Sequence, residues 1–350
     1  MNENIKIDNH QLTTFRIPIK ADKISFARWP HEFLQAYQRT KENNQELIIL
    51  GQGSNVLFLE DFNGEIVVNQ YQGIHLTCTQ EHFVLQVNSG VTIDELIAYC
   101  HRFKIYGLEN LASIPSSIGT AAIGNIGAYG VEFEKFVDKV ILLDLERGEK
   151  ITLTHEQLQF SYRSSILKTE YNKGYAVLTV VLKIAKNYQP VLTYYPLTEL
   201  DKEQVTAKQI QELVVKTRKA KLPDFNQYGN GGSFFVNPII SSIEYQVLKE
   251  RFNLQGIILN QEQVKLSAGW LIENTGLKGF SFRGAQVSPQ HALVLTNREK
   301  ATGMDIANLA AIVKTKVFEK FGVQLTPEIR FIAKNGEVDA SLYLEHLHHN

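Results

Sequence analysis

The stretch Asn110–Val131, NLASIPSSIGTAAIGNIGAYGV, contains no Lys, Arg, Asp or Glu, yet it is too rich in Gly, Ser, Asn and Pro for a membrane span. Its glycines permit backbone conformations that a Cβ would block, and they let another molecule approach the main chain closely. Backbone N–H groups exposed in this way bind anionic groups such as a pyrophosphate. A buried, glycine-rich turn region without a ligand is the alternative interpretation.

A second glycine-rich stretch, Leu50–Leu57 (LGQGSNVL), follows the apolar run Leu47–Leu50. Two loops suited to phosphate groups in one chain indicate a large, anionic cofactor. The second loop is not a Rossmann fingerprint, because no third glycine follows at the required distance and no long helix pattern opens after it. No Gly-Lys-Ser/Thr sequence occurs either, which argues against a P-loop enzyme that hydrolyses nucleotides.

The composition is that of an ordinary globular protein. The 350 residues allow a substantial core and two or three domains, with 44% hydrophobic residues, 21% charged residues and a formal net charge of −1. This balance predicts neither a nucleic-acid partner nor a membrane partner. The two cysteines, Cys78 and Cys100, form no CxxC pair, so we expect no disulfide framework and no metal site. The N-terminus lacks a secretory pattern, and we expect a cytoplasmic protein.

Short apolar segments predict an α+β fold, because strands outnumber helices in the first half and no regular strand–helix–strand period occurs. Amphipathic spacing predicts helices at Trp29–Thr40, Thr92–Phe103, Thr206–Lys219, Ser241–Phe252 and Met304–Phe321. Predicted strands are Glu46–Leu50, Val56–Leu59, Glu65–Asn69, Phe83–Val87, Val137–Asp144, Gly148–Leu153, Ala176–Ile184, Ala292–Thr296 and Glu328–Ala333.

A domain boundary is expected near Lys186–Gln189, where the run KNYQP interrupts the preceding strand. The segment Gly229–Pro238, GNGGSFFVNP, is expected to be a flexible loop that leads into an aromatic pair. Residues 341–350 are expected to be a tail, because their sequence partly resembles the scar of an expression vector.

Three polar residues suit catalysis or binding, and each has a structural alternative. Ser233 lacks the neighbouring residues that a hydrolase nucleophile needs. A serine in a loop shielded from water can instead protonate a strongly basic carbon. The structural alternative is that Ser233 only stabilises a turn. The guanidinium of Arg163 could bind a carboxylate or phosphate of a ligand. The alternative is an arginine exposed at the surface without a ligand. Glu328 precedes Arg330 on the same side of a predicted strand, so an internal ion pair is the alternative for that carboxylate.

Taken in order along the chain, nine motifs resemble the UDP-N-acetylenolpyruvoylglucosamine reductase family, flavoenzymes of bacterial cell-wall synthesis. Together they cover nearly the whole chain, and the ordered set is highly specific. The matching segments are LGQGSNVLF (Leu50–Phe58), GLENLASIPSSIGTAAIGNIGAYGVE (Gly107–Glu132), YRSSILK (Tyr162–Lys168), PVLTYYPL (Pro190–Leu197), KLPD (Lys221–Asp224), GNGGSFFVNP (Gly229–Pro238), KLSAGWLIE (Lys265–Glu273), ALVLTN (Ala292–Asn297) and LTPEIRFI (Leu325–Ile332).

The resemblance implies an α+β FAD-binding domain of the vanillyl-alcohol-oxidase-like (PCMH) type, made of two subdomains, at residues 1–187. A C-terminal α+β substrate-binding domain at 188–340 would follow, with a tyrosine-bearing loop near 190–200 that marks the longer form of the family. The implied activity is the NADPH-dependent reduction of UDP-N-acetylglucosamine enolpyruvate to UDP-N-acetylmuramate through FAD. FAD and NADPH are the implied cofactors, and we expect a monomer.

The resemblance also implies roles for individual residues. Arg163 and Glu328 would stabilise the negative charge that develops beside the substrate carboxylate, and Ser233 would then deliver a proton. Substrate-binding positions are Tyr162, Tyr194, Lys221, Asn237 and Arg330. Cofactor-binding positions are Gly51, Gly53, Ser54, Asn55, Ile114, Pro115, Ser116, Ser117, Gly119, Ile123, Asn125, Gly127, Ala128 and Arg218.

Two positions depart from the family pattern. Val236 stands where many relatives have Lys or Arg, and Ser116 stands where a glycine is expected after Pro115. We interpret both as tolerated variations that affect fine ligand contacts.

Two other functions stay open from the sequence. Another FAD-dependent enzyme of this fold, such as an alcohol or sugar oxidase, would not need the set Ser233, Arg163 and Glu328. Such an enzyme would often carry a histidine near the glycine loop, and none lies between Leu47 and Ile74. A non-catalytic flavin-binding or nucleotide-sugar-binding protein is harder to reconcile with the intact set of three residues.

Overall fold

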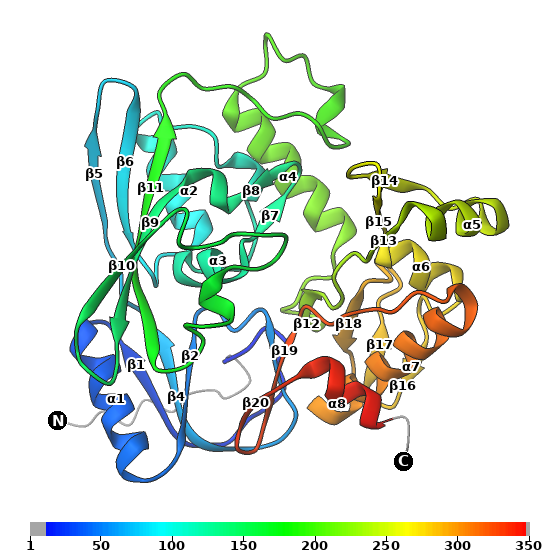
Figure 1. Cartoon of the computed structure of the whole chain (residues 1–350), viewed down its shortest axis with the longest axis horizontal. Coiled ribbons are helices and arrows are strands. Elements are labelled where there is room, and N and C mark those ends of the chain that lie inside the picture. The colour runs from blue at the N-terminus through cyan, green and yellow to red at the C-terminus, as the bar shows by residue number, and fades with distance from the viewer. Residues whose placement is uncertain (1–11, 348–350) are drawn as a thin grey trace. The chain divides into compact units, whose positions relative to one another are not determined.

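The computed structural model of the 350-residue chain describes residues 12–347. Within these residues, short sheets and helices alternate irregularly along the chain, and four of the six sheets contain only antiparallel pairs (Figure 1). The α+β class predicted from the sequence is therefore confirmed.

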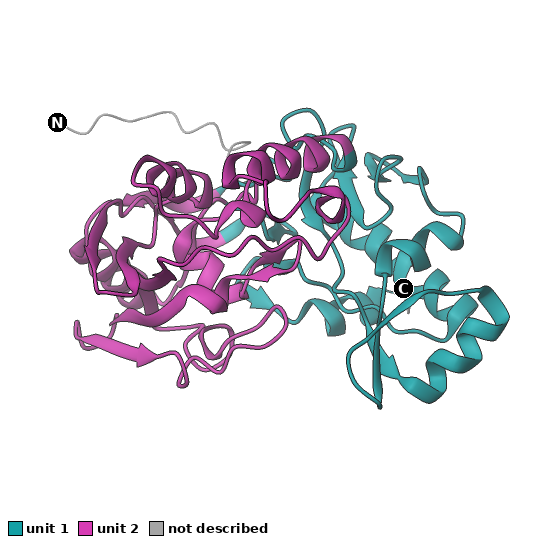
Figure 2. Cartoon of the chain, turned by 90° about the horizontal axis from the view of Figure 1, so that it is seen from above, with its two compact units in different colours: residues 1–20, 53–62, 221–350 teal, residues 21–52, 63–220 magenta. Residues whose placement is uncertain are grey.

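The chain folds into two compact units, coloured separately in Figure 2. Of the described residues, unit 1 comprises 12–20, 53–62 and 221–347, and unit 2 comprises 21–52 and 63–220. The boundary predicted from the sequence at residues 187–188 falls inside unit 2. Residues 53–62 belong to unit 1 because strand β3 (Val56–Phe58) pairs in parallel with β19 (Arg330–Ala333). No local sequence pattern predicts this pairing.

Unit 2 is built on a five-stranded antiparallel sheet of order β10-β9-β11-β6-β5 and a three-stranded sheet of order β1-β4-β2. Leu85, Val140 and Val180 from three neighbouring strands of the larger sheet are fully buried, and helix α3 packs against β11. The strands are β1 Ala21–Ala27, β2 Glu46–Leu50, β4 Phe62–Asn69, β5 Ile74–Cys78, β6 His82–Asn88, β7 Gly127–Ala128, β8 Val131–Glu132, β9 Val137–Asp144, β10 Lys150–Thr154 and β11 Tyr175–Ala185. The helices are α1 Pro30–Glu42, α2 Ile93–Arg102, α3 Ile118–Gly124 and α4 Ala207–Lys221, with short 3-10 turns at Glu109–Leu111, Phe133–Phe136, Ile166–Lys168 and Leu197–Glu199.

Unit 1 contains three small sheets and the 19-residue helix α7 (Gly303–Phe321), which packs against one of these sheets and contributes to the core of the unit. A capping box between Thr302 and Asp305 starts this helix, and Gly322 ends it in a left-handed conformation (φ 70°). The remaining strands of the unit are β12 Gly229–Ser233, β13 Ile239–Ser241, β14 Gly256–Ile258, β15 Gln263–Leu266, β16 Ser281–Phe282, β17 Ala285–Val287, β18 Val294–Asn297 and β20 Gly336–Val338. The other helices are α5 Ser242–Phe252, α6 Ala268–Asn274 and α8 Ala340–His346.

The segment Gly229–Pro238 is not the flexible loop that its glycines predicted. Its first five residues form strand β12, which pairs with β18, and the next two side chains, Phe234 and Phe235, lie in the core of unit 1. The expectation was wrong because hydrogen bonds to a neighbouring strand and two buried aromatic rings outweigh the backbone freedom of glycine.

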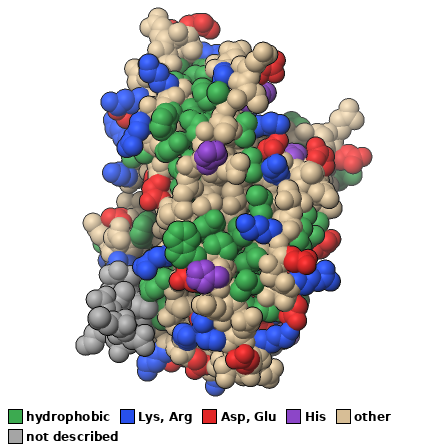
Figure 3. Space-filling view, turned by 90° about the vertical axis from the view of Figure 1, so that its left-hand side faces the viewer, with side chains coloured by type: hydrophobic (Ala, Val, Ile, Leu, Met, Phe, Trp, Pro, Cys, Tyr) green, Lys and Arg blue, Asp and Glu red, His purple; other side chains and the backbone are tan. Residues whose placement is uncertain are grey.

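Charges of both signs are interspersed on the face of the molecule drawn in Figure 3, and neither sign forms a continuous field there. Among residues 12–347, no helix combines the length and the apolar character that crossing a bilayer would require.

Residues 341–346 of the expected tail belong to helix α8 and are folded onto unit 1. Leu344 is fully buried in the core of unit 1, and Glu345 forms an ion pair with the buried Lys314 at 2.9 Å. Residues 348–350 lie outside the described part of the chain. Whether this sequence derives from a vector stays a prediction.

Replacing Leu344 with alanine should lower the free energy of unfolding by about 2–4 kcal/mol, because it leaves a cavity where α8 meets α7. Urea denaturation of the purified chain measures this loss. Leu342→Ala is the matched control on the same helix: Leu342 is 56% exposed, and its loss should be about 0.5 kcal/mol or less. Equal losses in the two variants would contradict the packing of α8.

Candidate active site

The predicted site residues are divided between the two units. Unit 2 holds Gly51, Ile114, Pro115, Ser116, Ser117, Gly119, Ile123, Asn125, Gly127, Ala128, Tyr162, Arg163, Tyr194 and Arg218. Unit 1 holds Gly53, Ser54, Asn55, Lys221, Ser233, Asn237, Glu328 and Arg330.

In unit 2, helix α3 of the central stretch lies directly against the main chain that follows two strands. A Cβ on Gly51, after β2, would lie 2.5 Å from the Ser117 Oγ, and a Cβ on Gly119 would lie 2.8 Å from the Ser89 Cβ. The Gly119 N–H donates to the Ser89 carbonyl at 3.0 Å. Only glycine allows such close contacts between the central stretch and the residues that follow the strands. The absence of side chains at these glycines also leaves the backbone of the stretch accessible to a ligand.

The two serines that open α3 take part in a compact hydroxyl cluster. Ser116 Oγ and Ser117 Oγ lie 2.9 and 3.1 Å from Thr120 Oγ1, which also accepts a hydrogen bond from the Ser117 N–H at 3.1 Å. Both serines are buried. Ser116, which departs from the family pattern, therefore has hydrogen-bond partners of its own in this fold.

Arg163 lies in a two-residue turn that is closed by reciprocal backbone hydrogen bonds between Ser161 and Ser164, at 3.0 and 3.1 Å. Its φ of 58° is left-handed, which is uncommon for a side chain of this size. The guanidinium donates from Nη2 to the Gly127 carbonyl at 2.9 Å and from Nη1 to the Asn125 carbonyl at 3.5 Å. The turn thus directs the Arg163 side chain onto the backbone of the central stretch.

Asn125 connects that stretch to the arginine turn. It ends α3 with a left-handed φ of 40°, and its side chain is fully buried. Nδ2 donates to the Ser161 carbonyl at 3.0 Å, while Oδ1 accepts from the Glu134 N–H at 3.1 Å. A parallel contact joins the Ser165 Oγ to the Ile123 carbonyl at 2.9 Å. These hydrogen bonds give the Asn125 side chain a structural role at the end of α3.

Arg218 on α4 is the predicted cofactor residue with the most unusual environment. Its Nε is buried, and within residues 12–347 it is one of four buried side-chain atoms that lack a hydrogen-bond partner. Burial lowers the pKa of the guanidinium, while the nearby Tyr129 and Asp94 oppose that shift. A buried cation with an unsatisfied donor beside the central stretch fits an anionic ligand.

Three predicted segments converge within unit 1. The Glu328 N–H donates to the Phe234 carbonyl at 2.8 Å, which places Glu328 beside the residue that follows Ser233. Asn55 Nδ2 donates to the Glu328 carbonyl at 3.2 Å, and the Asn55 carbonyl accepts from the Arg330 N–H at 3.1 Å. The structure therefore brings the backbones of Ser233, Glu328 and Asn55 together, although they come from distant parts of the chain.

Gly231 makes this convergence possible. A Cβ at this position would lie 2.7 Å from both Ile329 Cδ1 and Phe15 Cε2, and 3.1 Å from the Ser54 carbonyl oxygen. Any larger residue would push β12 away from the segments that carry Ser54 and Glu328. Gly53 is also constrained, since its φ is 60° and a Cβ would lie 2.1 Å from the Leu12 carbonyl oxygen.

Arg330 forms a bidentate ion pair, but not with Glu328. Its Nε and Nη2 donate to the two carboxylate oxygens of Glu337 on β20, at 2.8 and 2.5 Å. The sequence alternative named the wrong carboxylate because Glu337 enters only through the antiparallel pairing of β19 with β20. Each side chain of this pair is about one-third exposed, and the planar geometry fixes the Arg330 guanidinium.

Lys221 and Asn237 are the other substrate-binding candidates of unit 1, and hydrogen bonds to the backbone hold their segments in place. Asn230 Nδ2 donates to the Pro223 and Tyr228 carbonyls at 3.2 and 2.8 Å, which ties the segment after Lys221 to β12. Asn237 Oδ1 accepts from the Ala268 N–H at 2.9 Å. Because this bond occupies the oxygen, the Asn237 NH₂ group keeps its donors for another partner.

His291 was not among the predicted residues, although it lies near Lys221. Burial lowers the pKa of the His291 imidazole, and the charges of Lys221 and Lys278 lower it further. No spacing in the sequence indicates this neighbourhood, because the two residues are 70 positions apart in the chain.

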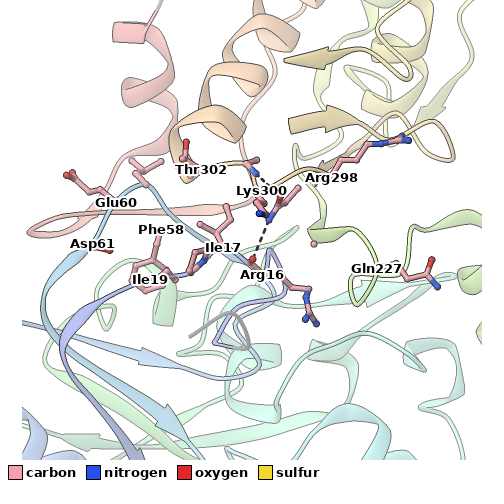
Figure 4. Close-up of a pocket in the computed structure, with 16 residues that line it drawn as sticks. Arg16, Ile17, Ile19, Phe58, Glu60, Asp61, Gln227, Arg298, Lys300 and Thr302 are labelled. Atoms are coloured by element: carbon pink, nitrogen blue, oxygen red, sulfur yellow. Dashed lines mark hydrogen bonds between the residues drawn. The ribbon is translucent and has the colours of Figure 1, made fainter. Parts of the chain in front are cut away.

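A pocket of about 500 Å³ in unit 1 contains none of the predicted site residues. Its wall includes the apolar Ile17, Ile19 and Phe58, and the charged ends of Glu60 and Arg298 point away from its centre (Figure 4). In the part of the chain that the structure describes, no group of three or more His, Cys, Asp or Glu side chains is arranged to hold a metal ion.

The left-handed turn at Arg163 leads to a test of backbone strain. Arg163→Gly and Arg163→Ala both remove the guanidinium, but only alanine must keep a Cβ at φ 58°. We expect the glycine variant to be more stable than the alanine variant by about 1 kcal/mol, measured by urea denaturation. Equal stabilities would mean that the turn relaxes away from the left-handed region.

Comparisons with known families agree with this arrangement. Residues 24–154 match the family model described as an FAD binding domain, and residues 224–332 match the model described as the UDP-N-acetylenolpyruvoylglucosamine reductase C-terminal domain. The crystal structure of UDP-N-acetylenolpyruvylglucosamine reductase from Thermus caldophilus shares the fold, with a TM-score of 0.62 and 22% identity, over 93% of this chain and 97% of that chain. The predicted fold class, an FAD-binding domain of the vanillyl-alcohol-oxidase-like type followed by a C-terminal α+β domain, is confirmed.

Curated relatives extend the match over nearly the whole chain. The UDP-N-acetylenolpyruvoylglucosamine reductase of Pasteurella multocida is 44% identical over 93% of this chain and 96% of its own length. The enzyme of the same name from Photorhabdus laumondii is 42% identical over 94% of this chain and 97% of its own length. At such identity and coverage, the chain belongs to the UDP-N-acetylenolpyruvoylglucosamine reductase family of flavin-dependent oxidoreductases.

Proposed function

We propose that the chain uses NADPH and bound FAD to reduce UDP-N-acetylglucosamine enolpyruvate to UDP-N-acetylmuramate, a step in the synthesis of peptidoglycan precursors. The observation that carries the proposal is the convergence, in unit 1, of the backbones of Ser233, Glu328 and Asn55. Residue types suited to charge stabilisation and proton donation thus lie together in a chain whose relatives carry the name of this reductase.

The residues of unit 2 fit an FAD. The close approaches at Gly51 and Gly119 leave no space for a Cβ, and Arg218 offers a buried, unsatisfied donor to an anion. We assign to the cofactor Gly51, Gly53, Ser54, Asn55, Ile114, Pro115, Ser116, Ser117, Gly119, Ile123, Asn125, Gly127, Ala128 and Arg218. When bound, FAD supplies hydride transfer from NADPH to the enolpyruvyl group of the substrate.

Arg163 is proposed to stabilise the charge that hydride addition creates. The added hydride leaves negative charge on the carbon that bears the carboxylate, in an enolate-like species. The two bonds to the Gly127 and Asn125 carbonyls hold the guanidinium in place before the reaction. Pre-orientation of this kind makes electrostatic stabilisation effective, because the donors do not reorganise as the charge develops.

Ser233 is proposed to protonate this carbon, with Glu328 as the second polar side chain that unit 1 contributes to the catalytic set. A serine hydroxyl is a poor acid in water, but an enolate-like carbon is a strong base, so the transfer is reasonable. Phe234 and Phe235, both buried, follow Ser233 directly, which limits water on that side. The backbone bonds of Glu328 to Phe234 and Asn55 keep its main chain beside this segment.

The remaining candidates are proposed to bind the nucleotide sugar. Tyr194, Lys221 and Asn237 supply a hydroxyl, an ammonium and an amide donor, which suit a diphosphate. Tyr162, whose ring lies 5.0 Å from the Arg163 guanidinium carbon, and Arg330, which Glu337 orients, complete the substrate-binding set.

Replacing Ser233 with alanine separates the two halves of the reaction. We expect the variant to keep its flavin spectrum and its reduction by NADPH under anaerobic conditions. Reoxidation of the flavin by UDP-N-acetylglucosamine enolpyruvate should slow by about 10²–10⁴-fold, because the proton donor is lost. Stopped-flow absorbance of the flavin measures both steps.

Ser281→Ala, an exposed serine in the same sheet as β12, should reoxidise at the wild-type rate. Unchanged reoxidation in Ser233→Ala would remove this residue from the mechanism. A wild-type flavin that only oxygen reoxidises would instead favour an oxidase, and absence of flavin would overturn the whole proposal.

Arg218→Met tests the cofactor assignment. Loss of a hydrogen bond from a charged donor should weaken FAD binding about 10- to 100-fold, measured by titration of the apoprotein. The apoprotein variant should nevertheless melt at a higher temperature than wild-type apoprotein, because the buried unsatisfied Nε is gone. Lys219→Met, at the exposed neighbouring position on α4, should change neither quantity. Normal FAD affinity in Arg218→Met would contradict the assignment.

A further inference from the structure

Asn110 joins two segments of unit 2 that lie far apart in the sequence. Its side chain is buried, and the single Nδ2 atom donates to the Tyr129 carbonyl at 2.8 Å and to the Val191 carbonyl at 3.0 Å. Tyr129 belongs to the central glycine-rich stretch, and Val191 lies at the base of the tyrosine loop, residues 190–200. Because an amide nitrogen carries two hydrogens, Asn110 uses its full donor capacity to hold the two segments together.

The turn that Asn110 contacts is under backbone strain. Tyr129 and Gly130 connect β7 to β8, and both have left-handed φ values of 48° and 84°. A two-residue hairpin turn of this kind favours Asn-Gly or Asp-Gly, so a tyrosine at the first position is costly. Such a conformation persists only where its surroundings enforce it, and the hydrogen bond from Asn110 to the Tyr129 carbonyl contributes to that constraint.

The tyrosine loop packs on this turn as well. A Cβ on Gly130 would lie 2.2 Å from the Thr193 Oγ1 and 3.4 Å from the Val191 Cγ1. Beyond the loop tip, Leu197 is fully buried in the core of unit 2. The tip residues between these two anchors, Tyr194 and Tyr195, are 43% and 64% exposed. The loop is therefore held on both sides of its tip, and the tip itself is presented to solvent.

We propose that Asn110 is a positioning residue, which fixes the base of the tyrosine loop on the central stretch so that Tyr194 is presented to the nucleotide sugar. The inference rests on the proposed function in one respect, because it takes Tyr194 as a substrate contact. Without the two hydrogen bonds, the loop base samples more conformations, and substrate binding must then restore their order. The loss falls on substrate binding more than on the chemical step.

The test uses the full chain loaded with FAD. In Asn110→Ala, we expect KM for UDP-N-acetylglucosamine enolpyruvate to rise about tenfold, while kcat changes by about twofold or less. Cleavage by chymotrypsin after Tyr194 should become several-fold faster, because the loop base is released. Asn110→Asp, which keeps the volume but replaces the donor by an acceptor facing two carbonyls, should give the same KM defect. It serves as the decisive variant if Asn110→Ala does not fold.

Asn88→Ala is the matched control. Asn88 also lies in unit 2, and its Nδ2 donates to a loop carbonyl, that of Gln72, at 3.0 Å. It should show wild-type KM and wild-type cleavage at Tyr194. A folded Asn110 variant with unchanged KM would overturn the proposal, even if its loop is cleaved faster. If wild-type enzyme does not turn over the substrate, the proposed function and the substrate role of the loop both fail, whereas the cleavage rates still decide whether Asn110 anchors the loop.

Discussion

Unit 2 depends on glycines that lie so close to a neighbouring side chain or backbone that a Cβ would not fit. Gly51 rests against Ser117, Gly119 against Ser89, and Gly130 against Thr193. Each contact positions a different part of the proposed site: the first two set the cofactor stretch on the strand ends, and the third seats the tyrosine loop. A stretch free of charged residues suits this task, because a long or charged side chain would need both space and solvation.

Backbone carbonyls accept hydrogen bonds from several side chains in and beside the proposed site. The carbonyls of Gly127 and Asn125 receive the Arg163 guanidinium, and those of Tyr129 and Val191 receive the Asn110 amide. In unit 1 the same principle brings Glu328 to Phe234. Carbonyl acceptors orient a guanidinium through its N–H groups, so these two bonds help to set the position of Arg163 before a substrate binds.

Local patterns predicted the five longest helices of the described residues but not the seven-residue helices α3, α6 and α8, because hydrophobic periodicity needs several turns to be recognised. Helix α7, for example, begins one residue before the predicted Met304 and ends at the predicted Phe321. The pairing of strands could not be predicted from local sequence. No residue near Val56 indicates its pairing with Arg330, and no residue near Arg330 indicates its ion pair with Glu337. Spacing alone also left Ser233 as a turn serine and β12 as a flexible loop. Only the ordered motifs of a known family indicate Ser233, Arg163 and Glu328 together, and no periodic pattern distinguishes a buried asparagine such as Asn110.

Two of the large residues with left-handed backbones in unit 2 connect strain with the proposed site. Arg163 and Tyr129 both lie in two-residue turns, where asparagine or glycine would be more comfortable. Each is held by hydrogen bonds from residues whose own side chains are buried, Asn125 to the Ser161 carbonyl and Asn110 to the Tyr129 carbonyl. A fold selected for stability alone would relax both turns with glycine. Strained conformations of this kind cluster at functional sites, and at Arg163 the strained turn agrees with the role proposed for its guanidinium.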